Sequence, residues 1–253
     1  MIELLPVALV LLPLFPATLW MNRLLQALPV GLRAVALVAL PVAGAYLLGR
    51  APVPAGAASP LAALAVVTAL LYAWRLLAVR EAFVWARLQA SSAWPLIWLA
   101  WLHGMPAESL LAVALALSLP AAALTLIGQS LARRIGGAYL GLRGRLGPAY
   151  PRLAGLWVLA LIATLAAPPA PGFFAILAVM YLLPGSLVFA VLATWLMWSW
   201  AATLQWQHGL YGPPWPRRAG TEDLSATASA VWLVLAVAAV ILGFIGVWAW
   251  PMH

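Results

Sequence analysis

The chain has 253 residues, of which 66% are hydrophobic and only 7% are charged, and its formal net charge is +8. This composition excludes both a soluble globular domain and a disordered chain. It predicts an all-α polytopic membrane protein, because the apolar segments are far longer than the roughly 10-residue strands of an outer-membrane barrel. The absence of cysteine excludes disulfides, iron–sulfur ligation and thiol chemistry.

Apolar segments follow one another along almost the whole chain. They cover approximately residues 4–21, 31–49, 60–79, 87–103, 107–131, 153–183, 185–206 and 226–250. They predict about eight transmembrane helices, provided that the longest segment crosses the membrane once. A short linker rich in proline follows the second segment, so we divide the chain into 1–50, with two leading helices, and 51–253, with six.

The basic residues are unevenly distributed between the segments. All thirteen are arginines, and twelve of them lie in the first, third, fifth and seventh connections, leaving only Arg50 in an even-numbered one. Because positively charged connections stay in the cytoplasm, this bias predicts both termini on the non-cytoplasmic side. Membrane orientation also explains the basic isoelectric point, so we expect the lipid bilayer, and no nucleic acid, as a partner.

The sixth segment, residues 153–183, contains a proline cluster in its middle. Pro168, Pro169 and Pro171 precede Gly172, and three prolines within four residues cannot sit in a continuous helix. Two structures remain open: a tight hairpin between two short helices, or one membrane helix broken in its middle. The arginine bias favours a single crossing, since two crossings would move the basic pair after residue 206 to the other side. Broken helices of this kind mark transport sites in many membrane proteins.

Charged side chains lie at segment ends rather than in their middles. Glu81 stands among Arg75, Arg80 and Arg87, which we interpret as a solvated cluster at the inner surface. No His, Glu or Asp group has metal-ligand spacing, and no acid/base pair is visible. We therefore expect no catalytic residue, no metal and no other cofactor.

Two further patterns concern helix ends and surfaces. Glu108 is expected in the first turn of the fifth helix, and Glu222 with Asp223 in the first turn of the last, where acids favour the helix dipole. Trp94, Trp98 and Trp101 form a stripe at helical spacing. We interpret the stripe as an aromatic belt at the lipid interface, with a ridge facing a partner as the alternative.

The second half of the chain carries short motifs in a fixed order. They are Arg80-Glu81 with Gln89-Ala90-Ser91-Ser92, Leu126-Ile127-Gly128-Gln129 with Arg133, Gly141-Leu142 with Pro151-Arg152-Leu153, Ala166–Phe173, and Tyr211-Gly212-Pro213 with Glu222-Asp223-Leu224-Ser225. On these motifs, residues 60–250 resemble the antiporter-like membrane subunits of complex I, Mrp antiporters, membrane hydrogenases and inorganic-carbon uptake complexes (the proton-conducting membrane transporter family). The resemblance implies one helix broken at Pro168–Gly172, with Ala166 in place of the family's first glycine.

The departures from the family concern its ion path. Family members have more helices than this chain, so the resemblance implies that the first ion half-channel is missing. In the second half-channel the family places a Glu or Lys four residues after the glycine of the break, which is Ile176 here. The family's His or Lys on the preceding helix falls near Ala116 or Pro120. The resemblance therefore implies that the charged ion-site positions are lost.

These departures lead to the hypothesis of a truncated, non-conducting scaffold subunit of an ion-coupled energy-converting complex. It would lie in a bacterial-type inner (cytoplasmic) membrane, would not itself be an enzyme, and would pack against a full-length antiporter-like subunit or another membrane subunit. In an inorganic-carbon uptake complex, a carbonic-anhydrase-like zinc protein would be a further partner. The alternative is an autonomous channel or transporter for a small neutral or anionic solute, with Gln89, Ser91, Ser92 and Gln129 lining a cavity at the break.

Overall fold

The computed structural model describes residues 4–53, 56–139, 145–213 and 221–249, with the side chains of His208 and of residues 242–249 outside this description. The motif pair Gly141-Leu142, the basic pair Arg217-Arg218 and both chain ends also fall outside it. Within the described residues the chain forms helices and one isolated bridge, and no strand.

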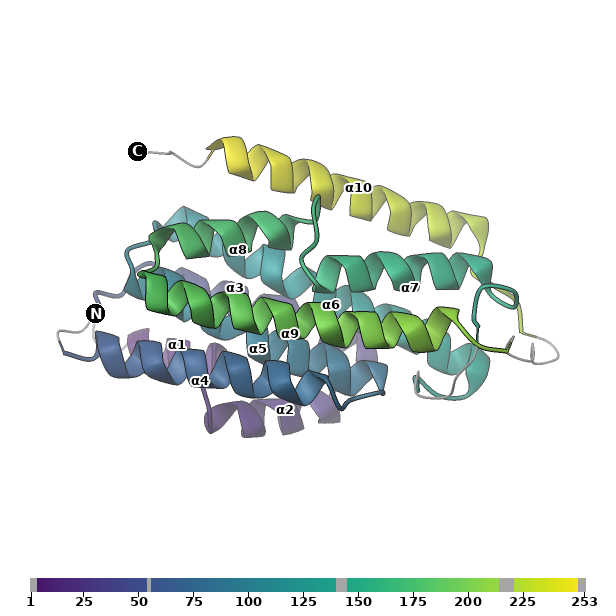
Figure 1. Cartoon of the computed structure of the whole chain (residues 1–253), viewed down its shortest axis with the longest axis horizontal. Helices are drawn as coiled ribbons and strands as arrows, with labels where there is room; N and C mark the ends of the chain where they lie inside the picture. The colour runs from purple at the N-terminus through teal and green to yellow at the C-terminus, as the bar shows by residue number, and fades with distance from the viewer. Residues whose placement is uncertain (1–3, 54–55, 140–144, 214–220, 250–253) are drawn as a thin grey trace.

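The helices run along one common direction (Figure 1). They are α1 (Leu4–Leu11), α2 (Ala17–Ala27), α3 (Val30–Leu48), α4 (Ala58–Leu76), α5 (Ala82–Leu102), α6 (Ala107–Ile135), α7 (Pro151–Thr164), α8 (Pro171–Leu182), α9 (Gly185–Leu210) and α10 (Ala226–Ala249). Among the described residues, four helical stretches are long and apolar enough to cross a membrane: α3, α4, α6 and Gly185–Gln207 of α9. The all-helical architecture is confirmed, whereas the count of eight crossings stays a prediction.

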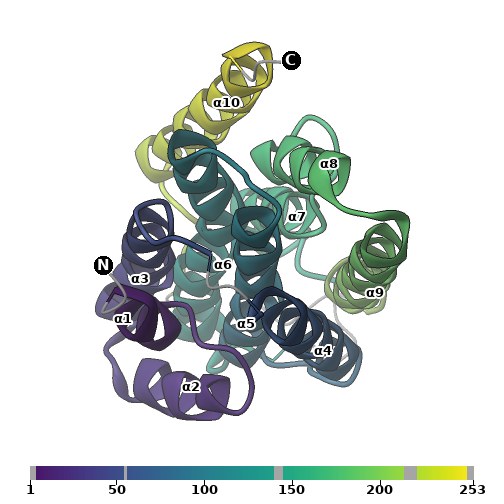
Figure 2. The same ribbon diagram turned by 90° about the vertical axis from the view of Figure 1, so that its left-hand side faces the viewer.

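α5 lies in the middle of the bundle beside α6, with the other helices around this pair (Figure 2). It packs against α2, α3, α4, α6, α8 and α9, and almost all of its side chains are buried. Trp94, Trp98 and Trp101 are only 1%, 0% and 4% exposed. The predicted aromatic belt at the lipid interface is therefore wrong. A tryptophan stripe has the same spacing on a lipid-facing helix and on one enclosed by protein, and here the neighbours enclose it.

The first apolar segment, expected to be one helix over residues 4–21, is divided into α1 and α2. Pro13 and Pro16 lie between these two helices, and neither can donate a backbone hydrogen bond. The carbonyl of Leu12 instead accepts a hydrogen bond from Trp98 Nε1 at 2.9 Å. Within the described residues two apolar segments are thus interrupted, whereas the sequence predicts an interruption only in the sixth.

α7 and α8 follow each other along the long axis of the molecule rather than folding back as a hairpin (Figure 1). Residues 165–170 separate them, and α9 packs against both. Of the two structures left open by the sequence, the chain has the geometry of one interrupted helix.

The segment before α10 holds the N-terminus of α7. The carboxylate of Asp223 accepts the N–H of Arg152 at 2.7 Å and that of Leu153 at 3.2 Å, so it caps α7 rather than the helix that follows it in sequence. α10 begins at Ala226 with no acid in its first turn. The expectation that Glu222 and Asp223 lie in that turn is wrong, because both residues precede the helix.

Replacing Asp223 by alanine should lower the free energy of unfolding by about 0.5–2 kcal/mol, because the first N–H groups of α7 lose their acceptor. Glu222→Ala is the matched control, since Glu222 is exposed and accepts the Arg134 Nε–H through its backbone carbonyl. The control should change stability by less than about 0.5 kcal/mol. Thermal denaturation of the purified chain in one detergent measures both, and equal losses would contradict the capping role.

Candidate functional site at the break between α7 and α8

The break frees backbone carbonyls that an unbroken helix would bond internally. Gln89 Nε2, on α5, donates to the carbonyl oxygen of Thr164 at 3.0 Å. Trp195 Nε1, on α9, donates to the carbonyl oxygen of Leu165 at 2.7 Å. Non-helical backbone within an apolar environment persists only where protein or water satisfies it. Here two side chains from neighbouring helices do so.

Ala166 follows these carbonyls and takes an unusual backbone conformation. Its φ is +51°, in the left-handed region, and its side chain is 2% exposed. An L-residue with a side chain pays roughly 1–2 kcal/mol there, whereas glycine does not. This is the position where the resemblance places a glycine, so the backbone requires the glycine-like conformation even though the sequence supplies alanine.

The three positions identified by resemblance lie on α6 and α8, which pack against each other beside the break. Ala116 and Pro120 are on α6, which packs against α8, and Ile176 is fully buried on α8. Pro120 has no N–H for the carbonyl of Ala116, its partner one turn earlier. A side chain on Gly172 would lie 3.7 Å from that carbonyl oxygen and 3.2 Å from Ala166 Cβ. Close backbone packing therefore occupies the region between α6 and α8 that holds these three positions.

The polar groups expected to line a cavity are mostly engaged in packing. Ser92 Oγ accepts a hydrogen bond from Trp198 Nε1 at 2.8 Å, and Ser91 Oγ accepts one from Asn22 Nδ2 at 2.8 Å. Gln89 keeps its Oε1 without a hydrogen-bond partner, and Gln129, on α6, is half-buried. Gln89, Ser91 and Ser92 thus connect α5 to different neighbouring elements rather than facing one common space.

Two arginines lie inside the bundle, a placement that the sequence did not predict. Arg33 is 8% exposed, and its guanidinium donates to the carbonyl oxygens of Leu25, Gln26 and Leu28 at 2.7–2.9 Å, which closes the C-terminal end of α2. Arg87 is 6% exposed, and its Nε has no hydrogen-bond partner. The interpretation of Arg87 as part of a solvated cluster is therefore wrong, because the helices packed around α5 bury it, whereas Arg75 is exposed and Arg80 and Glu81 are half-buried.

The carboxylates have structural positions at helix ends. Glu81 is the N-cap of α5, and its two oxygens accept the N–H groups of Phe83 at 3.1 Å and Val84 at 2.7 Å. Glu108 lies in the first turn of α6, as expected. Among the described residues, no group of three His, Cys, Asp or Glu side chains is placed to hold a metal ion.

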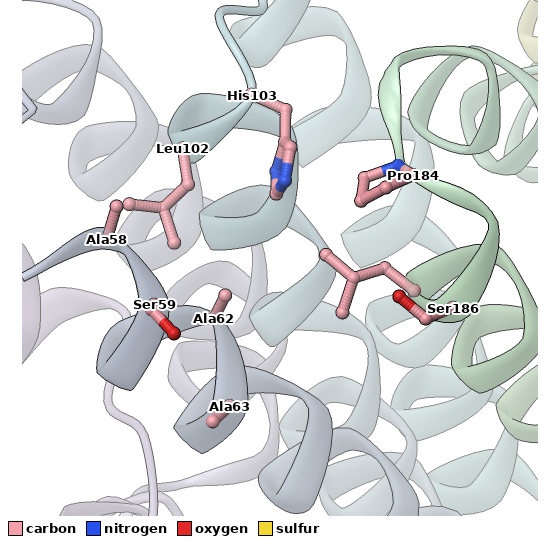
Figure 3. Close-up of a pocket in the computed structure, with 9 residues that line it drawn as sticks. Ala58, Ser59, Ala62, Ala63, Leu102, His103, Pro184 and Ser186 are labelled. Atoms are coloured by element: carbon pink, nitrogen blue, oxygen red, sulfur yellow. The ribbon is translucent and has the colours of Figure 1, made fainter.

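A pocket opens where α4 and α9 begin and α5 ends (Figure 3). His103 lies on one side of it and Pro184 with Ser186 on the other, and the remaining lining residues are small or aliphatic. The imidazole Nδ1 is 2.8 Å from the carbonyl oxygen of Leu99, so the ring is held by its own helix. The polar groups that line the pocket are therefore one imidazole and the hydroxyls of Ser59 and Ser186.

The fold places the chain among polytopic helical bundles with interrupted helices. No protein-family model matches the chain, and no curated protein matches it. Its structural class comes from solved structures instead.

Three solved structures are similar to this chain. A chain of respiratory complex I from Thermus thermophilus with bound NADH has a TM-score of 0.80 and 22% identity, over 93% of this chain and 52% of that chain. A chain of the same complex with bound Aureothin has a TM-score of 0.73 and 19% identity, over 94% and 54% of the two chains. A chain of the membrane-bound sulfane sulfur reductase (MBS), an archaeal respiratory membrane complex, has a TM-score of 0.78 and 18% identity, over 94% and 52%.

The chain therefore spans about half the length of the chains it matches and shares their fold. The expected likeness to antiporter-like membrane subunits is confirmed at the level of the fold.

Replacing Trp195 by phenylalanine should lower the free energy of unfolding by about 0.5–1.5 kcal/mol, because the carbonyl of the half-buried Leu165 loses its donor. Trp200→Phe is the control on the same helix, since Trp200 is 63% exposed. Its effect should stay within about 0.5 kcal/mol. Denaturation of the two variants in the same detergent compares them, and a loss of equal size in both would show that the indole N–H is not what matters.

Proposed function

We propose that this chain is a non-conducting accessory membrane subunit of an ion-coupled energy-converting complex. The observation that carries the proposal is the apolar, closely packed backbone at the break. By the resemblance, Ala116, Pro120 and Ile176 lie where the family's ion path carries charge. The carbonyls of Thr164 and Leu165 already accept hydrogen bonds from side chains of neighbouring helices. Ionisable residues within a membrane are costly and mark ion pathways by default, so apolar positions argue for packing.

The buried arginines support the same proposal. Arg33 and Arg87 are both buried by neighbouring helices, and Glu81 is the carboxylate near them. Two positive groups against one negative group raise the electrostatic energy of a proton or metal cation entering this region. A cation path through α2, α3 and α5 is therefore unfavourable.

The partners belong to the proposal as well. The similar chains come from multi-subunit respiratory assemblies, and exposed apolar side chains on α1, α2 and α10 offer surface to lipid or to another membrane subunit. We propose a larger antiporter-like subunit as the neighbour. An inorganic-carbon uptake complex is the host we favour, and stoichiometric zinc in the complex purified with a gentle detergent would support its carbonic-anhydrase-like partner.

Neutralising the titratable side chains one at a time in the native complex tests the non-conducting role. The variants are Glu81→Gln, His103→Asn, Glu108→Gln and His208→Asn, with assembly and ion-coupled activity measured separately. Each should assemble and keep most of its activity, whereas deletion of the whole chain should reduce assembly. A variant that assembles normally but loses more than about tenfold in activity, a barrier change of about 1.4 kcal/mol, would overturn the proposal.

The arginine distribution predicts the orientation in the membrane. α1 begins and α10 ends at the same end of the bundle, opposite the end where α6 is followed by α7 (Figure 1). Reporter fusions at Gly141 and at the C-terminus should therefore report opposite sides, with Gly141 in the cytoplasm. Two reporters on the same side would contradict this topology.

A further inference from the structure

α2 carries an exposed charge within an otherwise apolar outer surface. Trp20, Arg23, Leu24 and Ala27 recur at i, i+3, i+4 and i+7, so they share one side of the helix, which we call the α2 face. All four residues are exposed, Trp20 by 72% and Leu24 by 55%. The Arg23 guanidinium lies 5.4 Å from the centre of the Trp20 ring. Within the described residues it has this ring contact and no hydrogen bond or ion pair.

Contacts on the inner side of α2 place Arg23 away from both ends of the bundle. Its neighbour Asn22 donates from Nδ2 to Ser91 Oγ at 2.8 Å, and Ser91 is the tenth of the 21 residues of α5. At 1.5 Å per residue α5 is about 31 Å long, close to the thickness of a hydrocarbon core. α2 also lies between the two ends of α4 (Figure 1). Arg23 is therefore near the middle of the depth that the bundle spans.

The Arg23 side chain points away from the nearer membrane surface. α2 ends near the start of α5, where Arg33 donates to its last carbonyls and lies 5.4 Å from the centre of the Phe83 ring. Side chains of a helix lean toward its N-terminus, and the Trp20 ring that Arg23 contacts lies one turn in that direction. An arginine that faces lipid at this depth is strongly unfavourable. The chain on its own thus leaves a charge that a neighbour must compensate.

A second copy of this chain does not supply the missing acceptor. The described carboxylates lie at or next to helix ends and not at mid-depth: Glu81, Glu108, Glu222 and Asp223. Two α2 faces in a symmetric dimer would bring two arginines together, which is unfavourable. Lipid tails offer no hydrogen-bond acceptor either. The neighbour that fits is a different membrane helix with an acidic side chain.

We propose that the α2 face docks against a membrane helix of a partner subunit, and that this helix carries an Asp or Glu that pairs with Arg23. The planar guanidinium fork suits a carboxylate, and the pair is strong where water is excluded. Trp20 and Leu24 surround the pair with apolar contact, as aromatic anchors do at interfaces. The inference rests on the proposed accessory role, because both need a partner subunit, and it adds the contact face and the partner's charge.

Recovery of the native complex in a gentle detergent tests the α2 face. Arg23→Met and Trp20→Ala should each reduce the fraction of the chain that stays with its partners after dilution by at least about tenfold. The first leaves the partner's carboxylate without its pair, and the second removes the aromatic anchor. Arg75→Met and Trp74→Ala are the matched controls on α4, since Arg75 is exposed and Trp74 is 65% exposed. Both controls should stay with the complex as wild type does.

Photo-cross-linking identifies the partner helix while Arg23 stays in place, so it does not depend on the folding of an Arg23 variant. The photoreactive residue p-benzoylphenylalanine replaces Leu24, and the complex is irradiated and analysed by mass spectrometry. The cross-link should join one partner subunit, in a membrane helix with an Asp or Glu within one turn of the linked residue. The same replacement at Leu196, exposed on α9, should not reach that helix. Arg23→Glu should lose assembly, and exchanging the partner's acid for arginine should restore it.

The outcomes separate the docking face from the accessory role. Adducts with lipid alone, or a cross-linked helix without an acid near the linked residue, overturn the pairing with Arg23. A complex that keeps Arg23→Met and Trp20→Ala at the wild-type level, or loses the two α4 controls equally, overturns the α2 face and leaves the accessory role intact. A wild-type chain that purifies without any partner subunit overturns both.

Discussion

The structure depends on one constraint, which is that every backbone group released inside the apolar bundle must find a partner. Two apolar segments are interrupted, between α1 and α2 and between α7 and α8. α5 supplies a donor to each, Trp98 to the carbonyl of Leu12 and Gln89 to the carbonyl of Thr164. A helix that donates hydrogen bonds to both interruptions must lie between them, so α5 is enclosed by its neighbours. It also carries the polar side chains that donate, and it is less apolar than the helical stretches that are long and apolar enough to cross a membrane.

The same constraint explains the use of arginine. A guanidinium presents five donors in a planar fork, so one side chain can serve several carbonyls at once. Arg33 closes the end of α2, and Arg80 and Arg134 donate to carbonyls near the ends of α4 and α6. These arginines, which in the sequence indicate the orientation of the chain in the membrane, thus also cap helix ends. Arg87 differs, because the enclosing helices give its Nε no such acceptor.

The sequence predicted what depends on composition and on local backbone chemistry. It predicted long apolar helices and an interruption near Pro168–Gly172, because proline acts on its own turn; the interruption itself covers residues 165–170, and Pro171 and Gly172 begin α8. It did not predict the burial of Trp94 and Arg87 or the partner of Asp223, because those depend on residues 70 or more positions away or on what surrounds a helix. The two prolines at 13 and 16 carried a usable signal, since they stand in one apolar run, but the run was short enough to be read as a single crossing.

The separation of the partners along the chain sets an order for biosynthesis. Gln89 is made 75 residues before Thr164, so its amide is present when that carbonyl enters the membrane. Trp195 is made 30 residues after Leu165, and Asp223 follows Arg152 by 71 residues. With 14 and 12 residues, α7 and α8 are each too short to cross a membrane alone. The carbonyl of Leu165 and the N–H of Arg152 have no side-chain partner until α9 and the segment before α10 have been made. We therefore expect this interrupted helix to stay beside water or the insertion machinery during translation until the segment before α10 has been made.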